Sequence, residues 1–453
     1  MSHQSGSSSS DDSDESLESL DLDDDYKDFM AEQEAFDSIA EAIESKLKSR
    51  HEEETIESSR RRRSNTRIYI LRDREHAHEE LVSQYFSEDP IYTDFMFRTR
   101  FRMRRSLFLR IVDALGKWSQ YFTQRTDATN RKGLSPLIKC TAAMRMLAYG
   151  TPADSLDENL KIGKSTTLEC LGIFAQGVIE TFGPEFLRPP TVEETERILQ
   201  FNESRGFPGM LGSIDCMHWV WKNCPVAWRG QYTSGKEHAP TMILEAVATH
   251  DLRIWHSYFG VAGANNDINV LNHSPLFIQA LKGEAPKVYY SVNGTQYNAG
   301  YYLADGIYPQ WAAFVKSIAA PQSEKDKLYA QAQESARKDI ERAFGVLQSR
   351  FNIVDRPARK WKQVDVGKIM QACIILHNMI IEDQRQPGAT SFDLNSTPGL
   401  SYALPPGVSI GNSMSFAEVL RRNAAIRDRE THTKLRNDLV EHIWHCSRKR
   451  QNS

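Results

Sequence analysis

The sequence has no Cys-x-x-Cys pair, no long uninterrupted apolar run and little net charge for its 453 residues. Its six cysteines are scattered, which predicts buried thiols in a reducing compartment and argues against a disulfide scaffold or a zinc finger. No stretch approaches the roughly 18 consecutive apolar residues of a membrane span, and the first residues lack the order of a secretory signal. We therefore expect a soluble, intracellular protein with no membrane contact.

The net charge of −4 conceals two parts of opposite sign. Residues 1–59 contain nineteen Asp or Glu and four Lys or Arg, a charge of −15, which leaves +11 for residues 60–453. The acidic part has too few large apolar side chains to offset its chain entropy, so we expect it to be disordered. A basic remainder gains affinity for phosphates by displacing counterions, which favours DNA as a partner.

A compact basic cluster, Arg60-Arg61-Arg62-Arg63 followed by Arg67, adjoins the acidic part. An import receptor or a DNA backbone could reach such a cluster, and we favour import and therefore a location in the nucleus. A solvated charge cluster without a reader is an equally good interpretation of the motif alone.

Residues 68–200 have a helical pattern that includes an Arg-rich amphipathic stretch near Phe101. Three helices are predicted at Leu134–Tyr149, Ser155–Leu160 and Ser165–Phe182, and this spacing resembles a helix-turn-helix. The start of the third helix would then touch DNA, while a plain helical bundle is the alternative. The residues at that start are Lys161, Lys164, Ser165 and Thr166.

Beyond Pro208 short apolar runs replace the helical pattern and predict an α/β fold with a central sheet. We expect strands at Met210–Val220, Met242–Thr249, Ile254–Phe259 and Tyr301–Ala304. We expect helices at Ile268–Leu281, Ser323–Arg350 and Phe416–Trp444, with a loop at Pro387–Met414. The predicted organisation is an acidic tail with the basic cluster at 1–67, a helical DNA-binding region at 68–200, a catalytic region at 201–385, and a loop with a basic C-terminal helix at 386–453.

Two carboxylates lie in apolar strands, where a charge is costly unless it is paired or bound to metal. Asp215 is in the middle of the first predicted strand, and Asp305 follows Tyr301-Tyr302-Leu303-Ala304. Glu341 lies on the helix after Ser323 at the border of its buried face. Arg337, one turn earlier, is in reach of phosphate or of Glu341 itself. A capping or ion-paired role is the better interpretation of any one of these acids, and the joint pattern favours a site.

Carboxylate oxygens suit Mg²⁺ or Mn²⁺, and two such ions about 3.5–4 Å apart can clamp the attacking and leaving oxygens of a phosphodiester. One ion would activate water and the other would stabilise the departing 3′-oxygen. The residues therefore predict a divalent-metal site for cutting nucleic acid.

Three blocks of the sequence resemble the catalytic blocks of PIF/Harbinger transposases and their host-domesticated nuclease relatives. They are Gly212-Ser213-Ile214-Asp215, Tyr302-Leu303-Ala304-Asp305-Gly306-Ile307-Tyr308-Pro309 and Ile340-Glu341-Arg342-Ala343-Phe344-Gly345-Val346-Leu347, the last followed by Arg350-Phe351 and Leu376-His377-Asn378. The resemblance spans about Phe95 to Asp383.

This resemblance implies an RNase H-like DDE catalytic core with Asp215, Asp305 and Glu341 as the catalytic triad, preceded by a helix-turn-helix region. It also implies a further metal-site acid in a Gly-x-x-x-Asp segment, which Gly263 to Asp267 matches; capping the next helix is the alternative role of Asp267. The first block departs from the usual Asp-Gly-Thr-His, because here it reads Asp215-Cys216-Met217-His218. His218 would orient substrate or pack in the sheet.

The leading interpretation is a metal-dependent DNA endonuclease, either the transposase of an active element, which also joins DNA strands, or a domesticated descendant. The competing interpretation is a catalytically silent DNA-binding or chromatin adaptor that kept the fold. The resemblance further implies a separately encoded Myb-like partner protein, and a homo-oligomer is a further expectation. Loss of a triad acid would favour the adaptor, and all three are present.

Overall fold

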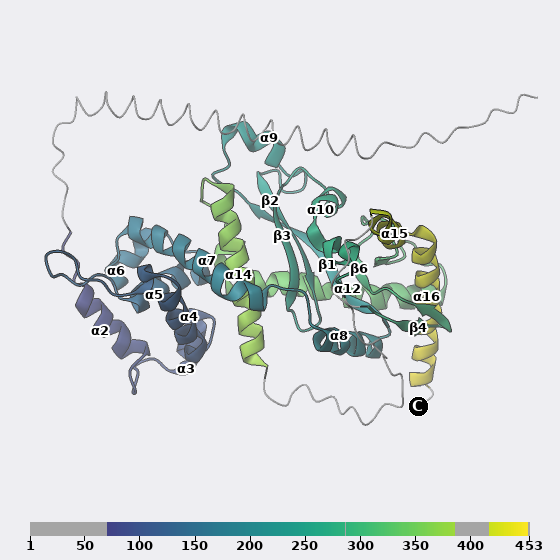
Figure 1. Cartoon of the computed structure of the whole chain (residues 1–453), viewed down its shortest axis with the longest axis horizontal. Coiled ribbons are helices and arrows are strands. Elements are labelled where there is room, and N and C mark those ends of the chain that lie inside the picture. Colours follow the sequence, from purple (N-terminus) through teal and green to yellow (C-terminus); the bar gives the residue numbers. More distant parts are fainter. Residues whose placement is uncertain (1–69, 286, 386–415, 452–453) are drawn as a thin grey trace, which may run out of the picture. The chain divides into compact units, whose positions relative to one another are not determined.

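The computed structural model describes residues 70–285, 287–385 and 416–451 (Figure 1). From Arg72 onward the described residues belong to one compact unit. The acidic segment 1–59, the basic cluster of Arg60 to Arg67 and the loop predicted at Pro387–Met414 lie outside the described residues.

The first part of this unit is helical, as predicted. Its α-helices are α2 (Arg74–Tyr85), α3 (Asp94–Phe101), α4 (Arg105–Trp118), α5 (Pro136–Tyr149), α6 (Asp157–Leu160), α7 (Lys164–Phe186) and α8 (Val192–Ser204), with 3-10 turns η1 (Gln120–Phe122) and η2 (Ala153–Leu156). Local signals set their ends. The Ser135 side chain accepts from the Ile138 amide at the start of α5, and Gly150 ends that helix with a φ of 61°.

The second part contains a mixed sheet of five strands in the order β3-β2-β1-β6-β7. The strands are β1 (Met210–Val220), β2 (Thr241–Ala248), β3 (Ile254–Ala262), β6 (Tyr301–Ala304) and β7 (Phe314–Lys316), and a separate hairpin is formed by β4 (Tyr290–Val292) and β5 (Thr295–Tyr297). β1 is antiparallel to β2 and parallel to β6. This confirms the predicted combination of a helical part and a sheet core.

Helices cover both faces of this sheet. Side chains alternate along a strand, so neighbouring residues enter different cores. Leu303 packs in one core with Ala336 of α12 (Glu324–Arg350), whereas Ala304 packs in another with Leu271 of α10 (Asp267–His273). α12 therefore lies on one face, beside β1 in Figure 1, and α10 lies on the other.

The helix α14 (Gln363–Gln384) was not predicted from the sequence. It is long and apolar enough to cross a membrane by length and composition, but 72% of its apolar window is buried inside the protein. It packs against α7 and β3, and its Ile375 and Met379 belong to the same core as Phe108 of α4. We interpret α14 as a core helix.

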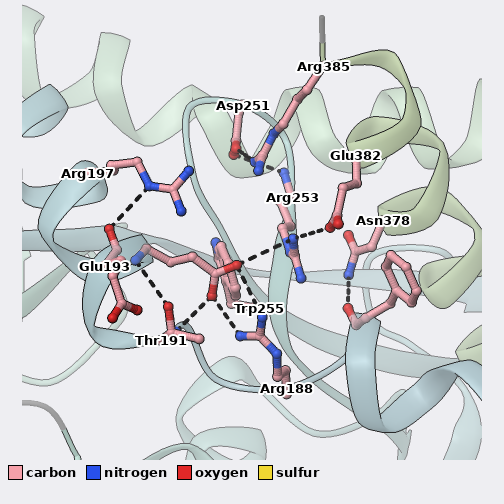
Figure 2. A network of polar contacts seen from close by, with 12 residues as sticks. Arg188, Thr191, Glu193, Arg197, Asp251, Arg253, Trp255, Asn378, Glu382 and Arg385 are labelled. Carbon is pink, nitrogen blue, oxygen red and sulfur yellow. Dashed lines mark hydrogen bonds and ion pairs between the residues drawn. The ribbon is translucent and has the colours of Figure 1, made fainter. Parts of the chain in front are cut away.

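A buried arginine holds three elements together where α14 passes the turn between β2 and β3. Arg253 is 1% exposed, and its Nη1 lies 2.8 Å from a Glu382 oxygen on α14 and 3.8 Å from a Glu194 oxygen on α8 (Figure 2). Its guanidinium also lies 4.2 Å from the centre of the Trp255 ring. Such a buried cation is tolerated because carboxylates and an aromatic face surround it.

Two predicted helices are wrong as single elements. The helix expected at Ile268–Leu281 is broken after His273, because Pro275 follows Ser274 and begins the turn η4 (Pro275–Phe277) before α11 (Ile278–Lys282). The helix expected at Phe416–Trp444 is two helices, α15 (Phe416–Ile426) and α16 (Arg429–Gln451). Asp428 separates them, because its carboxylate accepts from the amides of Glu430 and Thr431.

The predicted boundary between residues 200 and 201 falls within α8, just before β1. These two elements pack against each other, and one core contains residues from α4, α14 and the sheet. The boundary stays a prediction. The remaining elements are η3 (Val226–Trp228), α9 (Arg229–Tyr232) and α13 (Asn352–Asp355).

Candidate active site

Asp215 lies in the middle of β1 on the face that α12 covers. Its neighbour Ser213, two residues earlier, donates to the backbone oxygen of Ala336 on α12. The Asp215 side chain is 18% exposed and accepts a hydrogen bond of 2.8 Å from the Cys216 amide. Burial raises the pKa of Asp215 to about 6, and the negative charges of Asp305 and Asp267 act in the same direction.

Asp305 directly follows β6, the parallel neighbour of β1. The two strands pair Ser213 with Leu303, and the same register continued by two residues brings Asp215 level with Asp305. The Asp305 carboxylate accepts a bond of 2.9 Å from the Ile307 amide, which holds it at the strand end. The positive charge of Lys316 interacts with the negative charge of the Asp305 carboxylate, and the Lys316 ammonium donates to the backbone oxygens of Gly306 and Tyr308.

Glu341 on α12 is connected to Asp215 through an arginine. The Arg337 guanidinium lies 2.8 Å from a Glu341 oxygen and 3.3 Å from an Asp215 oxygen. Glu341 borders the buried face of α12, since Ile340 and Phe344 beside it are buried while its own side chain is 43% exposed. Two acids of the predicted triad therefore share one cation that the protein itself supplies.

Asp267 reaches the site from the opposite face of the sheet, at the first residue of α10. The helix is capped by Asn266, whose side chain accepts from the Asn269 amide, so the capping role considered for Asp267 is wrong. Burial raises the pKa of Asp267, and the charge of Asp305 raises it further. Asp267 thus does not provide the helix cap, and its negative charge interacts with those of Asp215 and Asp305.

The donors at this site fit a hard divalent cation. Asp215, Asp267, Asp305 and Glu341 offer only carboxylate oxygens, and the mutual repulsion of the aspartates is what a bound cation would relieve. In the arrangement seen across residues 70–285, 287–385 and 416–451, no three His, Cys, Asp or Glu side chains converge closely enough to hold an ion. Arg337 instead provides the positive charge for two of the acids.

A fifth acid near the site, and a fully buried one, was missed from the sequence. Glu245 on β2 pairs across the sheet with Cys216 and is fully buried. One carboxylate oxygen meets His256 and Ser274, and the other has no hydrogen-bond partner among the described residues. Glu245 could have been identified from the sequence, because it is a charged residue inside an apolar run, which is the same signal that identified Asp215. The run is Met242-Ile243-Leu244-Glu245-Ala246-Val247.

His218, the histidine of the first block, packs within the sheet. His218 Nδ1 lies 2.8 Å from the Thr241 hydroxyl of β2, and burial lowers the pKa of His218. The Cys216 thiol, on the same face of β1, lies 3.6 Å from the Tyr308 hydroxyl. Cys216 and Cys446 are only partly buried, so the prediction of six buried thiols is wrong at these two positions.

The pair His377-Asn378, which follows the third block, is structural in this protein. Asn378 donates to the backbone oxygens of Phe186 and Ile254 and accepts from the Ile254 amide. His377 donates to the Leu252 oxygen, and Arg350 lies 3.2 Å from its other ring nitrogen. These residues attach α14 to β3 and contribute no side chain to the acidic site.

The residues predicted to touch DNA lie at the start of α7. This helix begins at Lys164, one residue before the prediction. Lys161, Lys164 and Ser165 are exposed there, and Thr166 is partly buried. They are accessible to a large ligand, and their contact with DNA stays a prediction.

Comparison with known proteins finds similarity over the region that contains the acids. A family model described as "Plant transposon protein" matches residues 184–387, which contain all four predicted site acids, and one described as "Domain of unknown function (DUF8418)" matches residues 78–116. No solved structure gives a significant match.

Curated relatives point to the same family. The human protein "Putative nuclease HARBI1" is 23% identical over 295 residues, which is 64% of this chain and 78% of that protein. "Protein ALP1-like" of Arabidopsis thaliana is 25% identical over 284 residues, 59% of this chain and 67% of that protein. The transposon family model over residues 184–387 and these relatives together support the resemblance to Harbinger-derived nucleases.

Proposed function

We propose that the protein is a metal-dependent DNA endonuclease of the PIF/Harbinger type, with Asp215, Asp305 and Glu341 as its catalytic acids. The observation that carries the proposal is the placement of Asp215 and Asp305 level with each other on adjacent parallel strands, with Glu341 joined to Asp215 through Arg337. Three acids that are far apart in sequence are brought to one face of the sheet, and Asp215 is costly to bury there because burial disfavours its charged form.

The fold supports the RNase H-like core that the resemblance implies. Two of the acids lie on the central strand of a mixed sheet and at the end of its parallel neighbour, and the third comes from the long helix across that face. We propose this fold for residues 201–385, with the preceding helices as the DNA-binding region.

The four acids would hold Mg²⁺ or Mn²⁺, which would supply an activated water and charge stabilisation for the leaving 3′-oxygen. Asp305 precedes Gly306, which is exposed and has open space in place of a side chain. Arg337 would exchange its carboxylate partners for a phosphate oxygen, because a guanidinium binds either group in the same forked manner.

The proposal extends to the setting of the reaction. The exposed start of α7 would contact DNA, and the protein would act in the nucleus with a Myb-like partner and as a homo-oligomer in which strand transfer follows cleavage. The name "Putative nuclease HARBI1" supports a nuclease, and the family model "Plant transposon protein" supports a transposase.

A silent DNA-binding or chromatin adaptor is the second candidate, and one observation favours it. Arg337 already neutralises Asp215 and Glu341, and no convergent ligand group occurs in the described part of the chain. A protein in this state would be stable without metal.

Nicking of supercoiled DNA with Mg²⁺ or Mn²⁺ tests the two candidates. Wild type is compared with Asp305→Asn and with Asp113→Asn, an exposed acid of α4 that pairs with Lys117. The nuclease predicts metal-dependent nicking that only Asp305→Asn abolishes. Folded wild type that binds DNA and never cuts it, with its partner protein present, would establish the adaptor.

A further inference from the structure

Two segments that are distant in sequence form one surface beyond the end of β1. The Lys222 amide donates to the Ala358 oxygen at 3.0 Å, and the Asn223 side chain donates to the Arg359 oxygen at 2.6 Å. The Trp221 indole also donates to the Lys360 oxygen. Segments 222–236 and 356–364 are therefore fixed side by side, and we call them together the 222/356 surface.

This surface is strongly basic. Its two segments contain seven Lys or Arg and no Asp or Glu. None of the seven forms an ion pair with a described carboxylate, unlike Arg72, Arg188 or Arg253 elsewhere in the unit. Six of the seven are exposed and Lys360 is partly buried. The basic residues are Lys222, Arg229, Lys236, Arg356, Arg359, Lys360 and Lys362.

Large apolar side chains are interleaved with these cations. Trp361, between Lys360 and Lys362, is 68% exposed, and Trp228, beside Arg229, is 44% exposed. Trp228 is held in place by Tyr232, with the two rings stacked at 6.2 Å between centres. Exposed Trp has a cost in water, so its presence on both segments indicates a surface that a ligand covers.

The 222/356 surface borders the acidic site. The backbone amide of Ala264, three residues before Asp267, donates to the Gln231 oxygen, and the Gly263 amide donates to the Thr241 oxygen. Beyond Asp215, β1 continues to Val220, and the chain then passes directly into Trp221 and Lys222. A ligand on this surface would extend directly to the acids.

We propose that the 222/356 surface binds the phosphate backbone of duplex DNA that leads to the acidic site, with Trp361 and Trp228 packing on its sugars. This inference rests on the proposed function for the identity of the nucleic acid. Cations that have no carboxylate partner among the described residues, with aromatic side chains between them, suit a polyanion. An acidic protein segment is the alternative occupant, and the test separates the two.

The experiment measures binding of a labelled DNA duplex by fluorescence anisotropy in EDTA, where no cleavage occurs. Two variants each remove three charges, Lys222→Ala/Arg229→Ala/Lys236→Ala and Arg359→Ala/Lys360→Ala/Lys362→Ala. The matched control removes three exposed lysines on other elements, Lys282→Ala/Lys287→Ala/Lys434→Ala. Each surface variant should weaken Kd about tenfold or more and flatten the salt dependence by about 0.9 per lost phosphate contact. The control should change Kd less than about twofold.

Equal weakening by surface and control variants, or no weakening by either surface variant, would overturn the proposal. So would a surface variant that loses binding to polyglutamate and keeps full DNA affinity. Circular dichroism and the conservative Lys222→Gln/Arg229→Gln/Lys236→Gln variant guard against misfolding, since the Gln variant should weaken binding by a similar factor with an unchanged melting temperature. If DNA binding depends on the 222/356 surface but the protein never nicks DNA, the proposed nuclease activity is refuted and the proposed role of this surface in DNA binding is retained.

Discussion

The Arg337 guanidinium lies 3.3 Å from the carboxylate of Asp215, although 122 positions separate the two residues in sequence. It brings a positive charge from α12 to the central strand of the sheet. Because the same guanidinium also binds Glu341, it occupies the electrostatic role that a divalent cation would otherwise have at these acids.

Replacing Arg337 should therefore make the protein more dependent on metal. In Arg337→Met, the unpaired acids should lower the free energy of unfolding in EDTA by about 1–3 kcal/mol, and Mn²⁺ should bind more tightly than to wild type. Urea unfolding and titration calorimetry measure the two effects. Lys338→Met, an exposed change one residue along α12, is the control. Unchanged Mn²⁺ affinity in Arg337→Met would contradict competition between the arginine and the cation.

Substitutions of two neighbouring residues at the start of α10 should distinguish the role of a helix cap, Asn266, from that of a site acid, Asp267. Asn266→Ala removes the side-chain acceptor of the Asn269 amide and should cost about 1 kcal/mol of stability, with Mn²⁺ affinity unchanged. Asp267→Asn should leave stability nearly unchanged and weaken Mn²⁺ binding. Thermal melts with and without Mn²⁺ compare the two. An Asp267→Asn variant that melts like Asn266→Ala and binds Mn²⁺ normally would remove Asp267 from the site.

Asn378→Leu should destabilise the fold strongly. The substitution leaves the buried Phe186 oxygen and both backbone groups of Ile254 without their side-chain partner, which should cost about 2–4 kcal/mol. Chemical denaturation measures the loss. Asn437→Leu, at an exposed position of α16, should change stability by less than about 0.5 kcal/mol. A loss equally small for Asn378→Leu would show that α14 is attached to β3 by other contacts.

His377 should make the protein sensitive to acid. Burial and the adjacent Arg350 guanidinium lower the pKa of His377 to about 3 from its ordinary value of 6.5. The unfolded chain therefore takes up a proton that the folded protein excludes, so the free energy of unfolding should fall as the pH drops from 6.5 towards 3. His377→Gln should flatten this part of the stability profile, whereas His445→Gln, at an exposed position, should not. A profile that keeps its slope in His377→Gln would assign the acid sensitivity to other groups.

The sequence was sufficient for elements with a strong local pattern. The strand that contains Asp215 and the strand that Asp305 follows match the predicted ranges, because a short apolar run next to turn residues has few other interpretations. α14 was missed because it is buried on nearly all sides, and a helix without a polar face has no helical periodicity to detect.

The candidate site could be predicted in part. Each acid was identified by its conflict with its apolar surroundings or by the family resemblance. The Arg337 contact with Asp215 depends on how α12 packs across β1, and nothing in the local sequence of either element encodes that distance. The same holds for the 222/356 surface, whose two halves are joined only by tertiary hydrogen bonds.

The shared core has a consequence for how this protein can evolve. Phe108, Phe174 and Ile375 belong to one cluster with Trp219 of the sheet, so the N-terminal helices and the sheet bury each other's apolar surface. Neither part buries its apolar surface without the other. Recombination between relatives at the junction after α8 would leave both fragments with exposed apolar faces, so the helices that precede the acids must be inherited with them.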